Sequence, residues 1–230
     1  VLQGIFEEWE QKRDNRKYKM RIRNVLFNVP PGTGKSRLLS CFFPTWVWLR
    51  APGAKFLCLS VNEDASYRDA RDSKQLMACD WFQDTFQPQW ALRDDQEAVS
   101  NFGNTIGGVR ISKGLSAQII GLRADILLID DANDPTDVES KVKREKINDL
   151  WKDTLYNRVN HPETSIRIGI QQRTHEEDWS GFVLKQQGLW SEANPIGWLH
   201  VCLPAEFDPD RRCVTPWGSD PRQIKGEPLH

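Results

Sequence analysis

No apolar run in the 230-residue chain is long enough for a membrane-spanning helix, and the longest such runs have the length of strands. Only five cysteines are present, an odd number without a Cys-x-x-Cys pair, which argues against a disulfide framework or a cysteine zinc site. The first residues lack an initiator methionine and the pattern of a signal peptide. We therefore expect a piece of a longer protein, with reduced thiols and no membrane partner.

The formal net charge is only −1, so the chain as a whole lacks the cationic field that draws a protein onto nucleic acid. Its basic residues instead gather in two short clusters. The first consists of Lys12, Arg13, Arg16, Lys17, Lys19, Arg21 and Arg23, and the second consists of Lys141, Lys143, Arg144 and Lys146. Each cluster is interpreted either as a solvated face or as a contact for phosphate backbones or an acidic neighbouring subunit.

Apolar runs alternate with helical patterns along most of the chain. Predicted strands cover residues 24–29, 55–61, 126–130, 166–171 and 198–203. Predicted helices cover residues 35–50, 64–78, 139–157 and 176–187. Continuous apolar strands that alternate with helices are typical of a parallel sheet covered on both faces. The predicted fold class is therefore α/β, a mostly parallel sheet of five or more strands flanked by helices, with a glycine-rich β-hairpin insertion within residues 101–120.

A glycine-rich turn joins the first predicted strand to the first predicted helix; residues 29–36 form this glycine loop. Gly32 and Gly34 would let backbone N–H groups curl around phosphate oxygens, and the helix start that follows favours an anion. Lys35 can reach the β- and γ-phosphates of a nucleotide, and the Ser36 hydroxyl can ligate Mg²⁺. The residues predicted to bind the nucleotide are Pro30, Pro31, Gly32, Thr33, Gly34, Lys35, Ser36 and Arg37. One departure is Val29, which stands where this motif usually has its first glycine.

The predicted strand 126–130 ends in two carboxylates, Asp130 and Asp131. Open α/β sheets bind their ligands at the carboxyl ends of the strands. We expect Asp130 to hold Mg²⁺, directly or through water, and Asp131 to polarise the attacking water, with Asp134 as a weaker alternative base. Together with the glycine loop, this strand predicts a nucleotide triphosphatase that uses ATP and Mg²⁺.

Further short motifs lie between and after these two segments in a fixed order. They are Phe43-Pro44-x-Trp46, Gly107-Gly108, Ile120-Gly121-x-Arg123-Ala124-Asp125, Thr154-Leu155-Tyr156-Asn157-Arg158, Gln172-Arg173-x-His175-x-x-Asp178-x-x-Gly181 and Leu203-Pro204-Ala205. The series resembles the ATPase half of the large terminase subunit of tailed bacteriophages and prophages, over residues 24–204.

The resemblance implies a P-loop nucleotide triphosphatase fold of the additional-strand type, in which strand 166–171 lies between the two motif strands. It also implies that Gln171 and Gln172 lie near the γ-phosphate and sense its loss, although Gln171 could be a plain strand-terminal hydrogen-bonding residue. The implied domains are an N-terminal basic helical segment at 1–22, an ATPase domain at 23–204, and a linker toward an absent nuclease domain at 205–230.

The implied activity is an ATP-driven motor that moves double-stranded viral DNA into a procapsid. Its implied partners are double-stranded DNA, the portal protein, the small terminase subunit and further copies of the chain in a ring, a pentamer. The implied location is the host cytoplasm, on the procapsid portal, and not the mature virion. Nuclease activity is not expected in this segment.

The glycine loop lacks an arginine, although many large terminase subunits carry one there, and Asp131 stands where many P-loop motors have glutamate. The charge on the transferring phosphoryl group still needs a partner. Arg123 is the first candidate for an arginine finger from a neighbouring subunit, and Arg110 and Arg158 are second choices. Arg123 could equally form a structural salt bridge to Asp125 or Glu163.

Two other functions fit parts of the sequence. The glycine loop alone would suit a helicase or an AAA+ remodelling ATPase, but the helical lid of the latter and the second motor domain of the former are not evident. A nucleotide-binding scaffold without turnover is the third alternative. It would not require Asp131 beside Lys35, Ser36 and Asp130, because a binding protein needs no water-polarising acid.

Overall fold

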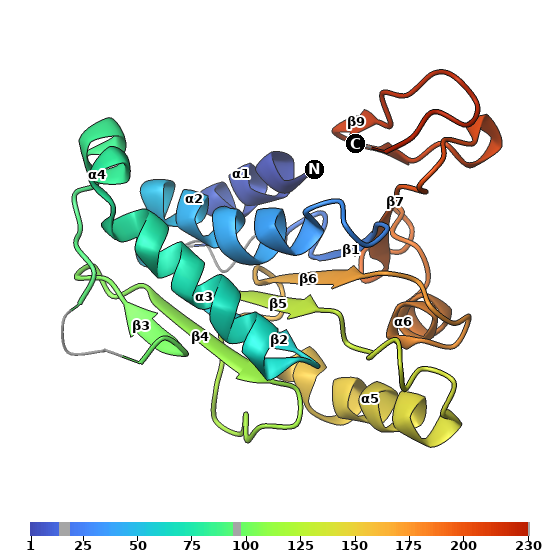
Figure 1. Cartoon of the computed structure of the whole chain (residues 1–230), viewed down its shortest axis with the longest axis horizontal. Coiled ribbons are helices and arrows are strands. Elements are labelled where there is room, and N and C mark those ends of the chain that lie inside the picture. The colour runs from blue at the N-terminus through green and yellow to red at the C-terminus, as the bar shows by residue number, and fades with distance from the viewer. Residues whose placement is uncertain (14–18, 94–97, 230) are drawn as a thin grey trace.

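The structure, a computed structural model, describes residues 1–13, 19–93 and 98–229 (Figure 1). In chain order, its elements are α1 (Leu2–Lys12), β1 (Asn24–Asn28), the π-helix η1 (Arg37–Phe42), α2 (Phe43–Arg50), β2 (Lys55–Ser60), α3 (Glu63–Ala78), α4 (Asp80–Phe86), β3 (Asn101–Gly103), β4 (Val109–Gly114), β5 (Ile126–Asp130), α5 (Lys141–Asp153), the 3₁₀-helix η2 (Leu155–Asn157), β6 (Ile166–Gln171), α6 (Trp179–Gln187), β7 (Trp198–Cys202), the 3₁₀-helix η3 (Pro209–Arg211), β8 (Val214–Thr215) and β9 (Gly218–Ser219).

Seven strands form one sheet in the order β3-β4-β2-β5-β6-β1-β7. Every neighbouring pair in it is parallel except β3 and β4, which confirms the prediction of a mostly parallel sheet flanked by helices. Strand β6 lies between β1 and β5, with Gln171 beside Asn28 and Ile170 beside Asp130. The two motif-bearing strands are therefore separated by one strand, in the order that the resemblance implies.

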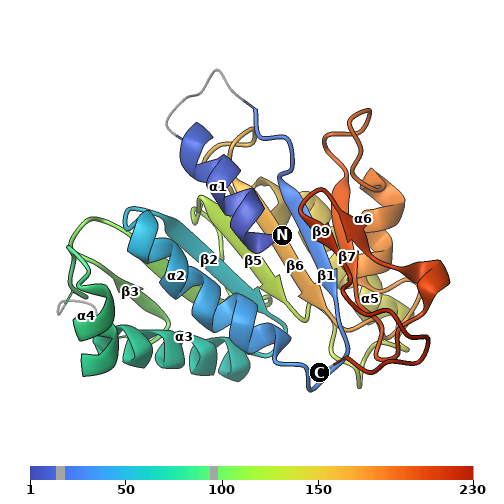
Figure 2. The ribbon, with the colours of Figure 1, turned by 90° about the horizontal axis from the view of Figure 1, so that it is seen from above.

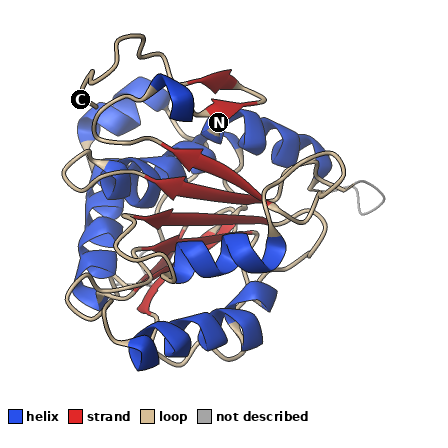
Figure 3. Ribbon diagram, turned by 90° about the vertical axis from the view of Figure 1, so that its right-hand side faces the viewer, coloured by secondary structure: helices blue, strands red, loops and turns tan. Residues whose placement is uncertain are grey.

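Two hydrophobic cores lie on the two faces of this sheet, because side chains of successive strand residues alternate between them. Val25 and Phe27 of β1 join α1, α2 and α3 in one core, whereas Leu26 joins α5 and α6 in the other. Three tryptophans form the centre of the second core, with ring centroids 5.1 to 5.8 Å apart: Trp151, Trp179 and Trp198. Figures 2 and 3 show the helices on both sides of the strands.

Several helix starts follow from capping residues. The Asn62 side chain accepts a hydrogen bond from the Ala65 amide at 3.1 Å and starts α3, and Asp178 does the same for α6 through the Gly181 amide at 2.8 Å. The predicted helix 176–187 consequently begins later than expected. The predicted helix 35–50 is divided into η1 and α2, where Pro44 has no N–H to donate to the preceding turn. Helix α4 was not predicted.

Residues 101–120, predicted as a β-hairpin insertion, contain two strands that belong to the main sheet. Strand β4 pairs in parallel with β2, and β3 then pairs antiparallel with β4 at the outer edge. In β4 the buried residues are Arg110, Ser112 and Gly114, and Arg110 lies beneath α3. The buried face of this strand is therefore polar, and its apolar periodicity is weak.

The two terminal segments contain more regular structure than their composition suggests. Helix α1 buries Ile5, Phe6 and Trp9 and is itself acidic on its outer side, while most cations of the first basic cluster follow it; Arg16 and Lys17 lie outside the described residues. In the tail, Arg222 and Asp220 form a buried ion pair at 2.7 Å. The proposed domain limits at 1–22, 23–204 and 205–230 remain predictions. Within the described ranges, no helix is both long and apolar enough to cross a membrane.

Candidate functional site

The glycine loop leaves the carboxyl end of β1 and enters η1, so the N-terminal amides of a helix face the same edge of the sheet as the loop. Gly32 and Gly34 have φ of 78° and 73°, in the left-handed region that only glycine adopts freely. A Cβ atom at either position would meet nothing within 4 Å, so backbone conformation, and not lack of space, requires glycine here. The Thr33 hydroxyl donates to the Pro30 carbonyl at 2.8 Å and closes the turn.

Asp130, at the end of β5, accepts hydrogen bonds from two hydroxyls of the helix that follows the loop. Ser36 donates to one carboxylate oxygen at 3.1 Å and Ser40 to the other at 2.8 Å. Burial, together with the neighbouring charge of Asp131, raises the pKa of Asp130 to about 6 although the two hydroxyls oppose the shift. Ser40 was not predicted. Its spacing of four residues from Ser36 places both hydroxyls on one helix face, which is a signal the sequence contains.

Asp131, directly after β5, contacts two other segments through its carboxylate and has an unusual backbone conformation. Its carboxylate lies 3.3 Å from the Lys35 ammonium group and accepts from the Gln172 amide at 3.2 Å. Its backbone has φ of 43°, a left-handed conformation that is unusual for any residue other than glycine. The fold therefore joins Lys35 and Ser36 to Asp130 and Asp131 across a separation of 94 to 96 residues.

The oxygen donors of Ser36 and Asp130 match the preference of Mg²⁺ for hard ligands. Within the described ranges there is no cluster of three or more His, Cys, Asp or Glu side chains that could enclose a metal ion. Magnesium in nucleotide sites is held by one or two side chains, waters and substrate phosphates, so the pair Ser36 and Asp130 fits such an ion without a larger cluster.

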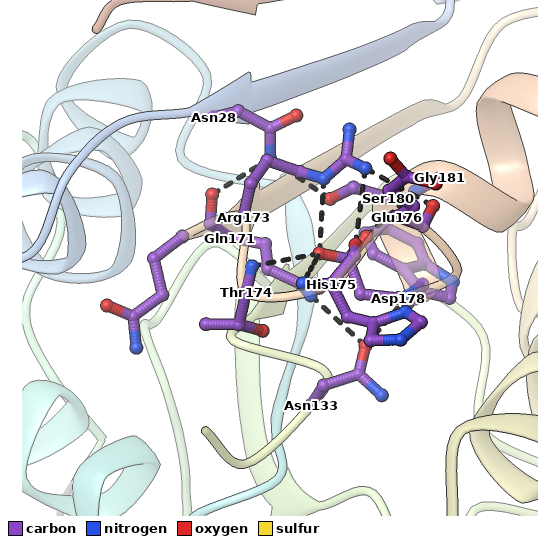
Figure 4. A network of polar contacts seen from close by, with 12 residues as sticks. Asn28, Asn133, Gln171, Arg173, Thr174, His175, Glu176, Asp178, Ser180 and Gly181 are labelled. Carbon is purple, nitrogen blue, oxygen red and sulfur yellow. Dashed lines mark hydrogen bonds and ion pairs between the residues drawn. The ribbon is translucent and has the colours of Figure 1, made fainter. Parts of the chain in front are cut away.

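Gln171 ends β6 between the two motif strands and is completely buried, with 0% of its surface exposed. Its side-chain amide donates to Asn133 at 3.1 Å, and Asn133 also accepts from the Trp179 amide at 2.7 Å. Its backbone carbonyl accepts from Asn28 at 2.8 Å (Figure 4). Gln171 thus connects β1, the segment after β5 and the start of α6. Asn133 was missed because a single asparagine after an acidic pair carries no periodic signal.

A tight loop follows β6 and is organised around Asp178, which is fully buried. The Asp178 carboxylate pairs with the Arg173 guanidinium at 3.1 Å and accepts from the Thr174 amide at 3.2 Å (Figure 4). Any side chain at Gly181 would collide with the Glu176 carbonyl, since a Cβ there would lie 1.8 Å from that oxygen. The motif from Gln172 to Gly181 therefore encodes one compact connection between β6 and α6.

Arg123 lies at the opposite end of β5 from Asp130. Its side chain is exposed, and it donates to the carbonyls of Val159 at 3.1 Å and Asn157 at 3.3 Å. The two suggested salt-bridge partners, Asp125 and Glu163, are engaged elsewhere, with Asn160 and Arg23 respectively. Strand β5 alone separates the two ends by about 13 Å at 3.3 Å per residue, so Arg123 cannot reach the glycine loop of its own chain.

Arg110 is not suited to the role of a finger. It is only 1% exposed and donates to the Ser73 hydroxyl beneath α3 at 2.8 Å, so it cannot contact another subunit. Arg158 is half-buried. Burial therefore excludes Arg110, whereas Arg158 stays a prediction.

Other predicted residues have partners outside the centre of the site. Arg37 forms an ion pair with Asp72 of α3 at the surface. The Asp134 carboxylate accepts from the amide and hydroxyl of Thr136 at 2.8 and 2.7 Å, which holds its pKa below the ordinary value and ties it to a turn. In the second basic cluster, Arg144 is buried and donates to the Val138 carbonyl at 2.6 Å, so the cluster is not a uniform solvated face.

Comparisons with known proteins find a match in sequence and a match in fold that agree with each other. No protein-family model matches the chain. The large terminase subunit of Enterobacteria phage T3 is 29% identical over 127 residues, which are 52% of this chain and 20% of that protein. The crystal structure of the HK97 bacteriophage large terminase matches with a TM-score of 0.51 and 12% identity, over 82% of this chain and 36% of that chain.

The resemblance to a large terminase subunit, which the order of motifs indicated, is thereby confirmed in sequence and in fold. The chain matches only about a fifth of the length of the T3 protein. The activity and partners of a whole terminase are therefore matters for proposal.

Proposed function

We propose that this chain is the ATP-hydrolysing motor segment of a large terminase subunit, of the P-loop type with an additional strand, and that it translocates double-stranded viral DNA into a procapsid. The observation that carries the proposal is the meeting of four groups from distant segments at one edge of the sheet: Lys35, Ser36, Asp130 and Asp131. A chance glycine turn would not gather a lysine, a hydroxyl and two carboxylates in this way.

In this proposal the glycine loop binds the phosphates of ATP. Free backbone amides at the start of η1, with Gly32 and Gly34 in left-handed conformations, favour an anion at this position. The Lys35 ammonium group, now beside Asp131, would turn to the β- and γ-phosphates as ATP enters, because phosphate oxygens carry more charge than one carboxylate.

Ser36 and Asp130 would hold Mg²⁺, which when bound neutralises charge on the β- and γ-phosphates. The hydroxyls of Ser36 and Ser40 fix the Asp130 carboxylate before any ion arrives. Release of Lys35 to the phosphates would then free Asp131 to orient and polarise the attacking water, as a general base must lie within hydrogen-bond reach of that water.

Gln171 and Gln172 would report loss of the γ-phosphate. The Gln172 amide contacts Asp131, and Gln171 contacts Asn133 and thereby the first amide of α6. A shift of Asp131 on hydrolysis would therefore be felt in the loop after β6, which is tied to Asp178.

The remaining catalytic charge would come from Arg123 of a neighbouring copy, since Arg123 lies at the far end of β5 from its own glycine loop. This arrangement requires an assembly, such as a ring of copies on the portal protein together with the small terminase subunit and DNA. The support for these partners is that the T3 and HK97 relatives are described as large terminases.

The proposal is tested by the steady-state rate of ATP hydrolysis as a function of protein concentration, with and without double-stranded DNA and portal protein. We expect specific activity that requires Mg²⁺, rises as copies associate and rises further with DNA. Tight ATP binding with no turnover under any of these conditions would favour the nucleotide-binding scaffold instead.

A further inference from the structure

A small cavity lies behind Asp130, between the sheet and α3. Its volume is about 10 Å³, and the polar side chains that line it are Ser40, Ser60, Ser66, Asp69, Arg110 and Asp130. A volume of about 10–15 Å³ available to a water centre is enough for one water molecule, and such a water needs two to four polar partners. The cavity is therefore of a size and polarity that suit one water.

Arg110 brings an unsatisfied donor to this cavity. The guanidinium is 1% exposed; its Nη1 donates to Ser73 at 2.8 Å and its Nε donates to Ser112 at 3.3 Å. The third nitrogen, Nη2, is buried and has no acceptor in the part of the chain that the structure describes. A buried donor without a partner destabilises a fold, and more so when it belongs to a charged group, so a partner is expected.

Two carboxylates provide the acceptors on the other walls. Asp69 faces the cavity from α3 and is 4% exposed, and Asp130 faces it from β5 and is 8% exposed. The nearest cation to Asp69 at the surface is Arg68, whose Nε lies 3.5 Å away. Two buried carboxylates and one buried guanidinium therefore line a single cavity. A water molecule there can donate a hydrogen bond to each carboxylate and accept one from the guanidinium.

We propose that this cavity binds one ordered water, which accepts from Arg110 Nη2 and donates to Asp69 and Asp130, and that Arg110 is a positioning residue for Asp130. Arg110 then acts on the proposed metal site without touching metal or nucleotide, because the water fixes the Asp130 carboxylate in addition to the hydrogen bonds from Ser36 and Ser40. The positioning role rests on the proposed function, in which Asp130 holds a divalent cation.

The same arrangement connects α3 to the metal site. Ser73 of α3 accepts from Arg110 and donates to the Cys41 carbonyl of η1 at 2.9 Å. A movement of α3 would thus displace the guanidinium, the water and the Asp130 carboxylate together. Residues that hydrogen-bond to a metal ligand without binding the metal themselves typically change metal affinity by about 10–100-fold when they are removed.

The test uses Mn²⁺ as the probe, alone and with ADP, and measures its affinity by electron paramagnetic resonance. Arg110→Met removes every donor while keeping the length of the side chain, and Arg110→Lys retains the charge but not the three-nitrogen fork. Arg167→Lys is the matched control, because Arg167 is also a buried strand arginine but lies near the amino end of β6, where it donates to the Tyr156 carbonyl at 2.9 Å.

We expect Mn²⁺ with ADP to bind about 10–100-fold more weakly to Arg110→Met than to the wild-type chain. The loss of affinity should be smaller for Arg110→Lys and absent for Arg167→Lys. Should Arg110→Met fail to fold, Arg110→Lys carries the comparison with Arg167→Lys. A crystal structure of the wild-type chain should show one water between Arg110, Asp69 and Asp130.

An empty cavity in a map that resolves other buried waters would overturn the water site. Mn²⁺ affinity in folded Arg110→Lys and Arg110→Met equal to that of Arg167→Lys would overturn the positioning role. A wild-type chain that binds no Mn²⁺ with ADP would instead overturn the proposed function together with the positioning role, while the map would still decide the water site.

Discussion

The two ends of the central strands use charged residues in opposite ways. At the amino ends, arginines donate to loop carbonyls: Arg23 to Pro162 at 2.9 Å, Arg123 to Val159 at 3.1 Å and Arg167 to Tyr156 at 2.9 Å. At the carboxyl ends, charged side chains meet one another and the first residues of a helix, as Lys35 meets Asp131.

The contacts at the amino ends fix the structure, whereas those at the carboxyl ends can take part in chemistry. A guanidinium bound to carbonyls closes a loop and holds one arrangement, even where a carboxylate also pairs with it, as Glu163 pairs with Arg23 at 2.9 Å. Ionic pairs between side chains can be exchanged for a substrate, because phosphate oxygens can replace a carboxylate as the partner of Lys35. The comparison predicts large effects on turnover at the carboxyl ends and, within a single copy, effects on stability at the amino ends.

The largest effect is expected for Lys35→Ala, which should abolish ATP turnover and leave the fold intact, because Lys35 supplies the cation beside Asp131 and the nearby Arg37 is paired with Asp72. ATP hydrolysis and circular dichroism of the purified variant measure the two properties. Arg167→Lys serves as the control from the amino ends. Hydrolysis at the wild-type rate by folded Lys35→Ala protein would disprove the assignment of the site.

Arg123 is the exception that would break the comparison, since it lies at the amino ends but is proposed to act in a neighbouring copy. Arg123→Ala should lower turnover by about 10³–10⁵-fold, the usual range for an arginine finger. Mixing Arg123→Ala with Lys35→Ala should restore part of the activity, because mixed interfaces combine an intact glycine loop with an intact Arg123.

The mixing experiment is informative only where assembly is demonstrated, for example by light scattering of the mixture. Absence of any recovery in assembled mixtures would reject Arg123 as a residue that acts between copies. Arg110 could not then take its place, since it is buried.

Asp130 and Asp131 are adjacent in sequence but should differ in effect. Asp131→Asn should bind ATP and Mg²⁺ and hydrolyse ATP about 10²–10⁴-fold more slowly, as for loss of a general base. Asp130→Asn should weaken Mg²⁺-dependent binding of ATP, because its carboxylate is the one held by Ser36 and Ser40. Titrations of ATP with and without Mg²⁺ separate the two outcomes, and equal losses of binding would contradict this division of roles.

The smallest effect is expected at Asn62, which lies at the carboxyl end of β2 but only caps α3. Asn62→Ala should lower the free energy of unfolding by about 1 kcal/mol through loss of the cap, with unchanged ATP turnover. Urea unfolding and the ATPase assay measure the two. A clear loss of turnover without loss of stability would show that the start of α3 belongs to the site.

The sequence predicted the parts of the fold that local pattern controls. Strands β5 and β6 have the predicted bounds because continuous apolar runs with abrupt polar ends leave little freedom in where a buried strand stops. The position of β6 between β1 and β5 came from the resemblance alone, since no local pattern specifies which strands are neighbours.

The glycine loop and the acidic pair were also predictable, because their chemistry requires particular residues at particular spacings. The partners behind them were not. Whether Arg110 faces solvent or α3 depends on the register of β4, and Asn133 contacts Gln171 only because β5 and β6 are neighbours in the sheet. Such contacts depend on tertiary packing, and a single sequence carries no direct record of it.

The left-handed backbone of Asp131 has a consequence for how this segment could be engineered. A non-glycine residue in that conformation is strained by about 1 kcal/mol, and glycine would relieve the strain while removing the carboxylate. If Asp131 polarises the attacking water as proposed, selection for heat resistance alone would favour a protein without turnover. Under the proposed role, stability and turnover make opposite demands on residue 131, and the aspartate found there favours turnover.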